Sequence, residues 1–471
     1  MTPSKKFRRL AAAAACLLAT ASLAEGPARE VPPKQRERLA FIAPTGLTPL
    51  RGKLVFSAYH ALRGQELWTT DGTLQGTTLL KEIRPGFQGS FPTGFVAFRG
   101  HVYFTATDGA AGLELWRTDG TPGGTRMVVD LRAGAEGSTP NALTTLGDAL
   151  YLVANDGRQG FQLWRTDGTG ASFRRLTNVQ SSAGAVPRQL TPAGARLFFT
   201  ATDAQAGHEL WTSDGTPEGT RRVKDVRPGP QDSNIENLVV VGGTLFFTAN
   251  DGVHGTELWK SDGTEAGTVL VRDIRAGDAP SRPAYLSVLG NQLLFSADDG
   301  QNGTELWRSD GTAAGTTLVK DIRPGAAHAF PNHLTVAGTR AFFAASDGVH
   351  GVELWQTDGT AAGTTLVADI APGDASGSPA RLAWIGDRLW FTASHGTHGT
   401  EAWTSDGTRA GTQLAVDVVP GPGNGIPSRY TPLRGGMALT AEDGNGNERL
   451  WWRGKDGRLV LLGAPLAARL R

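Results

Sequence analysis

Cysteine is almost missing from this chain of 471 residues, in which Cys16 is the only one. A single cysteine cannot close an intramolecular disulfide and cannot supply a cluster of thiolates for a metal. The chain also lacks an excess of either charge, because 46 basic residues stand against 45 acidic ones and the formal net charge is +1. Nucleic-acid binding needs a basic surface, so this balance excludes it.

Long apolar runs are missing too, except near the N-terminus. Basic residues within positions 5–9 precede an apolar segment over 10–24, which is short for a transmembrane span. Small residues at positions 22 and 24 suit a cleavage site, so we expect a Sec-type signal peptide over 1–24 and a secreted, periplasmic or cell-surface protein. Lipid attachment at Cys16 is the alternative. No other segment is long enough to predict a transmembrane helix.

Glycine and tryptophan are abundant, at 63 and 12 residues. Nine of the tryptophans recur every 47 or 48 residues, and similar text surrounds each of them. Such a regular series identifies nine copies of one structural unit of about 48 residues. The nine repeated tryptophans are Trp68, Trp116, Trp164, Trp211, Trp259, Trp307, Trp355, Trp403 and Trp451.

Each unit predicts four short antiparallel strands joined by glycine-rich turns. In the fifth unit the apolar strand around Phe247 is followed by the turn 251–255, the strand around Trp259, the turn 262–268 and a last strand near 269–274. Apolar side chains on both faces require cover on both faces, which radially stacked blades provide. We therefore expect an all-β propeller of four-stranded antiparallel blades.

The number of blades follows from the number of units. The ninth unit has a degraded motif around Trp451, so eight blades plus a cap is the alternative to nine. We expect a linker over 25–44, in which residues 38–43 form an additional strand that helps to close the ring. A single propeller of nine repeats is then expected over 45–471.

The repeated text resembles the ELWxxDGT repeat family, which is named after this motif. Units one, two, four, five, six and seven match it in full, whereas unit three has Gln162 for Glu and unit eight has Ala402 for Leu. The resemblance covers about residues 45–463. It implies an exported bacterial propeller-like protein, and it carries no catalytic residues over to this chain.

Two acidic positions recur in this motif. The Asp of Asp-Gly-Thr is expected to stabilise a turn by bonding the backbone two residues later, and the Glu before Leu-Trp is expected to accept backbone hydrogen bonds. Calcium bound by the acidic turns is the alternative, although no EF-hand pattern is present. We otherwise expect no cofactor and no metal. The repeated aspartates are Asp71, Asp119, Asp167, Asp214, Asp262, Asp310, Asp358 and Asp406.

Function is expected where the units differ, because the repeated residues explain how blades form. The most variable segments follow the last strand of each unit, as in 85–94, 228–237 and 324–333, and variable loops on a rigid scaffold often bind ligands. Nine similar units without a unique catalytic cluster predict an exported, non-catalytic binding or scaffold protein. Its expected partner is a protein or polysaccharide at the cell surface. A multivalent lectin and a polysaccharide hydrolase or lyase are the alternatives.

Overall fold

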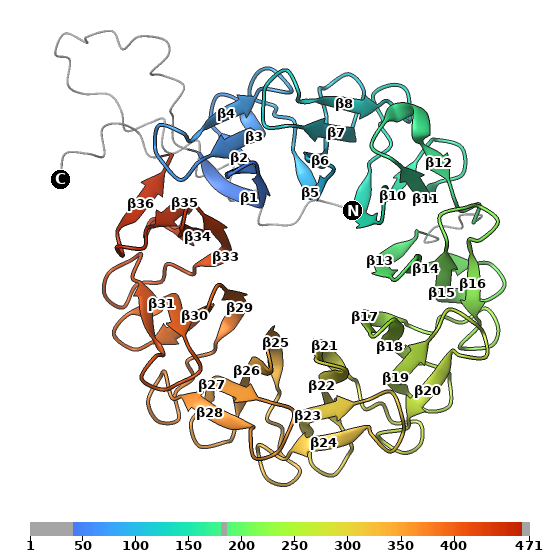
Figure 1. Ribbon diagram of the computed structural model, residues 1–471, viewed down its shortest axis with the longest axis vertical. Coiled ribbons are helices and arrows are strands. Elements are labelled where there is room, and N and C mark those ends of the chain that lie inside the picture. Colours follow the sequence, from blue (N-terminus) through green and yellow to red (C-terminus); the bar gives the residue numbers. More distant parts are fainter. Residues whose placement is uncertain (1–40, 180–185, 464–471) are drawn as a thin grey trace.

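Nine four-stranded antiparallel sheets stand around a common centre in the computed structural model, which describes residues 41–179 and 186–463 (Figure 1). The prediction of a nine-bladed β-propeller is confirmed. The alternative of eight blades plus a cap is wrong, because the last unit forms a complete sheet like the others. The expected signal peptide and residues 25–40 of the expected linker lie outside the described residues. We number the blades 1 to 9 in chain order.

Every blade consists of four consecutive strands, and the first strand of each blade borders the centre (Figure 1). The first strands are β1 (Ile42–Leu50), β5 (Thr93–Phe98), β9 (Asn141–Leu146), β13 (Arg188–Ala193), β17 (Glu236–Val241), β21 (Ala284–Leu289), β25 (Asn332–Ala337), β29 (Ala380–Ile385) and β33 (Ser428–Leu433). The second strands are β2 (Lys53–His60), β6 (His101–Ala106), β10 (Ala149–Asn155), β14 (Arg196–Asp203), β18 (Thr244–Asn250), β22 (Gln292–Asp298), β26 (Arg340–Ser346), β30 (Arg388–His395) and β34 (Gly436–Glu442).

The two outer strands of each blade carry the repeated motif and the rim. The third strands are β3 (Gly64–Thr70), β7 (Glu114–Thr118), β11 (Phe161–Thr166), β15 (Gly207–Ser213), β19 (Thr256–Ser261), β23 (Thr304–Ser309), β27 (Val352–Thr357), β31 (Gly399–Ser405) and β35 (Glu448–Arg453). The fourth strands are β4 (Thr78–Lys81), β8 (Arg126–Val129), β12 (Arg174–Arg175), β16 (Arg221–Lys224), β20 (Val269–Arg272), β24 (Thr317–Lys320), β28 (Thr365–Ala368), β32 (Gln413–Val416) and β36 (Leu459–Leu462). In the described residues one 3-10 turn, η1 (Gly170–Ser172), lies between the third and fourth strands of blade 3.

The hydrophobic core is divided into separate clusters between neighbouring blades. Between blades 5 and 6, for example, Phe246 and Leu258 of one blade pack with Phe295 and Trp307 of the next. Each of the nine interfaces has its own cluster of this kind. The repeated tryptophan therefore packs against the preceding blade, which explains why it recurs once in every unit.

The ring closes between blades 9 and 1 through side chains. Trp68 of blade 1 packs with Leu450 and Leu462 of blade 9, as the equivalent tryptophans pack on their preceding blades. Phe41 fills the same cluster, and its carbonyl oxygen accepts a hydrogen bond from Arg449 at 3.0 Å. Residues 42 and 43, expected to belong to an additional closing strand, are the first residues of β1. Among the described residues, no helix could span a membrane.

Candidate functional site

The Asp-Gly-Thr segments form one repeated turn between the third and fourth strands. In blade 5 an Asp262 oxygen accepts hydrogen bonds from the Thr264 N–H at 2.8 Å and hydroxyl at 2.7 Å. These bonds hold the pKa of Asp262 below its usual range. The Thr264 hydroxyl in turn accepts the Gly267 N–H at 3.0 Å, and a Cβ on Gly267 would lie 2.2 Å from the Asp262 carboxyl carbon. The motif is thus a closed hydrogen-bonded turn.

The Glu of the motif is buried in each of the seven blades that carry it. Glu257 is fully buried and accepts hydrogen bonds from the Ile274 N–H at 3.1 Å and the Ser281 N–H at 2.8 Å, and from the Ser281 hydroxyl. Burial raises the pKa of Glu257 to about 7. In blade 3 Gln162 takes this place, and its side-chain oxygen accepts the Val179 N–H at 3.2 Å. This position ties the loop after the fourth strand to the blade.

The histidines of the turns between second and third strands each lie beside a carboxylate. The ring nitrogens of His254 and His350 are 2.7 and 2.8 Å from Asp251 and Asp347, and that of His398 is 3.2 Å from Asp417. The hydrogen bond that the His254 ring donates to the Asp251 carboxylate raises the pKa of His254. Across residues 41–179 and 186–463, no group of three or more His, Cys, Asp or Glu side chains could hold a metal ion.

A β-bulge recurs in the first strand of every blade. In blade 6 the pairing of β21 with β22 shifts between Ala284 and Ser287, so two residues oppose one on the partner strand. The first of them, Tyr285, has a φ of 56°, in the left-handed region that only glycine adopts without strain. The equivalent residue is left-handed in all nine blades.

These nine residues differ in side chain although their backbone is the same, and we call them the bulge ring. Following the blades in order, they are two glycines and an alanine, two amides, two aromatic rings and two guanidinium groups. The bulge ring consists of Gly46, Gly94, Ala142, Gln189, Asn237, Tyr285, His333, Arg381 and Arg429. All but half-buried Gly46 are exposed to solvent, and their strands border the centre of the propeller (Figure 1).

Several side chains of the bulge ring lean onto the next blade. The Gln189 amide donates to the Ile235 carbonyl oxygen at 3.0 Å, and one Arg381 nitrogen donates to the carbonyl oxygens of residues 426 and 427 at 3.0 and 3.1 Å. The rings of Tyr285 and His333 have centroids 6.0 Å apart. Partial desolvation by its neighbours lowers the pKa of His333, and the Arg381 charge lowers it further, so this imidazole is neutral at pH 7. The sectors of the ring are therefore chemically distinct.

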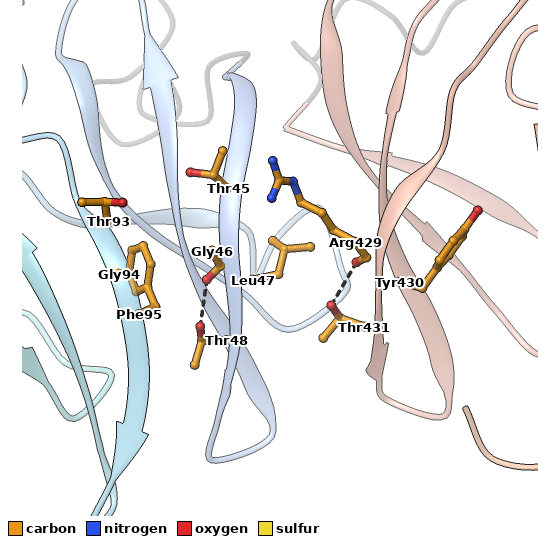
Figure 2. Close-up of a pocket in the computed structure, with 10 residues that line it drawn as sticks. All are labelled: Thr45, Gly46, Leu47, Thr48, Thr93, Gly94, Phe95, Arg429, Tyr430 and Thr431. Carbon is orange, nitrogen blue, oxygen red and sulfur yellow. Dashed lines mark hydrogen bonds between the residues drawn. The ribbon is translucent and has the colours of Figure 1, made fainter. Parts of the chain in front are cut away.

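A pocket with a volume of about 510 Å³ lies where the bulge ring has its two glycines. It is bounded by β33 on one side and by β1 and β5 on the other (Figure 2). Arg429 is its only charged residue, and Figure 2 shows this side chain directed toward β1. Its lining residues are Thr45, Gly46, Leu47, Thr48, Thr93, Gly94, Phe95, Arg429, Tyr430 and Thr431.

The bulge ring was not identified from the sequence. Its signal is a position two residues after the proline that opens most first strands, as in Pro283–Tyr285, Pro331–His333 and Pro379–Arg381. This position changes from glycine to arginine between units whose motifs are almost identical. The variable segments 85–94, 228–237 and 324–333 each end on one of its residues, Gly94, Asn237 and His333, but the sequence does not show that these residues share one ring.

No protein-family model and no curated protein matches the chain. Its structure is similar to that of a puromycin hydrolase, at 17% identity and a TM-score of 0.37 over 74% of this chain and 59% of that one. It is also similar to that of a prolyl endopeptidase, at 11% identity and a TM-score of 0.43 over 78% of this chain and 54% of that one. The propeller domain of the Trilobed protease from Pyrococcus furiosus is similar as well, at 11% identity and a TM-score of 0.35 over 69% of this chain and 98% of that domain. The chain spans less than two thirds of the length of the first two.

The expected function is corrected by this comparison. A non-catalytic binding or scaffold protein was predicted, whereas the similar propellers in puromycin hydrolases and prolyl endopeptidases belong to peptidases, which are hydrolases. At these identities and TM-scores the likeness is one of fold, and it assigns no residue of this chain to a reaction.

Proposed function

We propose that the protein recognises peptide substrates at the centre of its ring, through the side chains of the bulge ring. The observation that carries this proposal is that seven blades hold a side chain in a backbone conformation that favours glycine. A left-handed residue with a Cβ costs roughly 1–2 kcal/mol. Blades 1 and 2 have glycine at the same bulge, with φ of 68° and 67°, so the fold itself accepts glycine there.

Burial does not compensate for this strain. Tyr285 remains 47% exposed, and the amides and arginines of the ring are exposed as well. Strained residues that gain little from packing are typical of sites that bind a ligand. We infer that these side chains are retained for contacts with a molecule inside the ring.

The order of the side chains supports a single, asymmetric ligand. Nine identical sites would need nine similar residues, whereas the bulge ring passes through small, amide, aromatic and cationic sectors. Amide side chains such as Gln189 and Asn237 can bond to peptide N–H and C=O groups. The rings of Tyr285 and His333 offer contact for apolar side chains, and the guanidinium groups suit carboxylates. A peptide presents all three kinds of partner.

The test is binding of a pool of short random-sequence peptides, labelled at the N-terminus and measured by fluorescence polarisation. We expect the double variant Tyr285→Gly/His333→Gly to bind the pool more weakly than the unchanged protein. The control variant is Val253→Ser/Val349→Ser, which alters two exposed apolar residues on turns between second and third strands and should bind normally. Mass spectrometry of the same mixtures detects cleavage. Equal binding by all three proteins would refute a role for the bulge ring.

We also propose that the chain is exported and belongs to the ELWxxDGT repeat family. The basic residues at positions 5–9, the apolar segment 10–24 and the small residue Ala24 support export, and the repeated motif supports the family. N-terminal sequencing of protein recovered from outside the cytoplasm should begin at Glu25. An intact Met1 on the exported protein would contradict cleavage at this site.

A further inference from the structure

At the pocket between blades 9, 1 and 2 the bulge ring has two glycines in place of side chains. Packing requires glycine at only one of these two positions. A Cβ on Gly46 would lie 2.2 Å from the Phe95 ring, so glycine is required there. A Cβ on Gly94 would meet only Leu143, at 4.0 Å. Seven other blades carry side chains in the same left-handed conformation. Gly94 thus keeps a space empty that the fold would allow a side chain to fill.

The groups around this space are hydrogen-bond donors and one positive charge. The hydroxyls of Thr48 and Thr431 are engaged by the carbonyl oxygens of Gly46 and Arg429, at 2.9 and 3.0 Å. Within the described residues the hydroxyl of Thr45 makes no hydrogen bond, so it is available as a donor. The hydroxyl of Thr93 is available in the same way.

Arg429 is only partly neutralised by its own blade. Its nearest carboxylate is Glu448, 3.7 Å from the Arg429 Nε, and the same Glu448 oxygen accepts the Thr440 hydroxyl at 2.8 Å. The Arg429 side chain is 45% exposed. It therefore offers planar N–H groups to an anion in the pocket, and a carboxylate matches that geometry in a bidentate manner.

Apolar groups line the pocket beside these donors. Leu47 and Phe95 are half-buried members of the blade interfaces, and both border the empty space. The volume of about 510 Å³ is within the range of ligand sites, roughly 300–1,000 Å³. One guanidinium balances one negative charge, so a monoanionic carboxylate next to an apolar side chain fits this pocket better than a dianionic phosphate.

We propose that the pocket binds the C-terminal carboxylate and last side chain of the peptide, which fixes the direction in which the peptide enters the ring. This inference rests on the proposed function and names the end of the substrate that the ring holds. The Arg429 guanidinium contacts the carboxylate, the Thr45 and Thr93 hydroxyls donate to its oxygens, and Phe95 contacts the last side chain.

The experiment compares two labelled pools of random-sequence peptides that differ only at the C-terminus, one with a free carboxylate and one with an amide. The protein should bind the amide pool about tenfold more weakly, the loss expected when one charge-assisted hydrogen-bonded pair is removed. Arg429→Gln should reduce binding of the free-acid pool to the level of the amide pool. Gly94→Gln should do the same by filling the pocket, whereas Ala142→Gln, at the next position of the bulge ring and outside the pocket, should not.

The outcomes distinguish failure of this inference alone from failure of the proposed function. Equal binding of the two pools by the unchanged protein, with weaker binding by Tyr285→Gly/His333→Gly, would overturn the carboxylate site and leave peptide recognition standing. Binding of neither pool would overturn both. Displacement of the free-acid pool by inorganic phosphate as readily as by acetate would show a general anion site and would overturn the assignment to a peptide terminus.

Discussion

The buried Glu of the repeated motif makes the stability of the propeller depend on pH. Burial raises the pKa of Glu257 to about 7 from an ordinary value of 4.5. No cation in the described part of the chain pairs with it, and Asp273 nearby raises its pKa further. Because its folded pKa lies above its unfolded value, this carboxyl contributes stability that is complete below pH 4.5 and is lost as the pH rises through 7.

The magnitude follows from the difference between the two pKa values. Moving from about pH 5 to about pH 8 removes roughly 2.5 kcal/mol of unfolding free energy for one such carboxyl. Five other blades have the same arrangement, with pKa values of about 7 for Glu66, Glu209, Glu305, Glu353 and Glu401. Their effects have the same sign, so we expect the protein to be more stable at pH 5 than at pH 8.

The assay is urea unfolding at both pH values, with Glu257→Gln as the matched variant. Blade 3 already carries Gln162 at this position, so the amide is compatible with the fold. The variant should show a smaller difference in stability between the two pH values than the unchanged protein. A protein that is equally stable at both pH values, or more stable at pH 8, would refute the reasoning and would mean that backbone hydrogen bonds keep the carboxylates ionised at pH 5.

Two further predictions concern the turns and the closure of the ring. Gly124→Ala places a Cβ 2.0 Å from an Asp119 oxygen, so it should lower the unfolding free energy by about 1–3 kcal/mol. The control Gly123→Ala has open space around its Cβ and should leave the unfolding free energy unchanged. Equal urea midpoints for the two variants would contradict the turn geometry. Phe41→Ala removes a side chain that is 1% exposed in the interface between blades 9 and 1, so it should lower the unfolding free energy by about 3–5 kcal/mol. The control Phe91→Ala removes a side chain that is 46% exposed and should change the stability measured by calorimetry little. An unchanged stability of Phe41→Ala would contradict closure of the ring by side-chain packing.

The fold could be predicted from the sequence because one interaction is repeated in every unit. Trp307 packs against the preceding blade at an interval of 48 residues, and the spacing from Trp68 to Trp451 therefore reports the number of blades directly. The packing that closes the ring between blades 9 and 1 could not be predicted in the same way. Phe41 lies outside the repeat, and its packing between the first and last blades depends on the ring having brought them together.

The candidate site could not be predicted because it depends on backbone conformation. Tyr285 in a strand sequence is expected to be a packed aromatic residue, and only the bulge with its φ of 56° turns it out of the sheet. The empty space beside Gly94 likewise depends on the distance between Gly94 and Leu143 in the next blade. A sequence shows that these positions vary between units, but not that they share one ring.

The most direct test of the account is the unfolding free energy of Tyr285→Gly/His333→Gly, measured in urea with and without the free-acid peptide pool. Relief of the left-handed strain offsets the greater flexibility of unfolded glycine, so the variant should be as stable as the unchanged protein or more stable by up to about 1 kcal/mol per substitution. The peptide pool should stabilise the unchanged protein and have a smaller effect on the variant. A clear loss of stability without peptide would contradict the claim that these side chains serve a ligand rather than the fold.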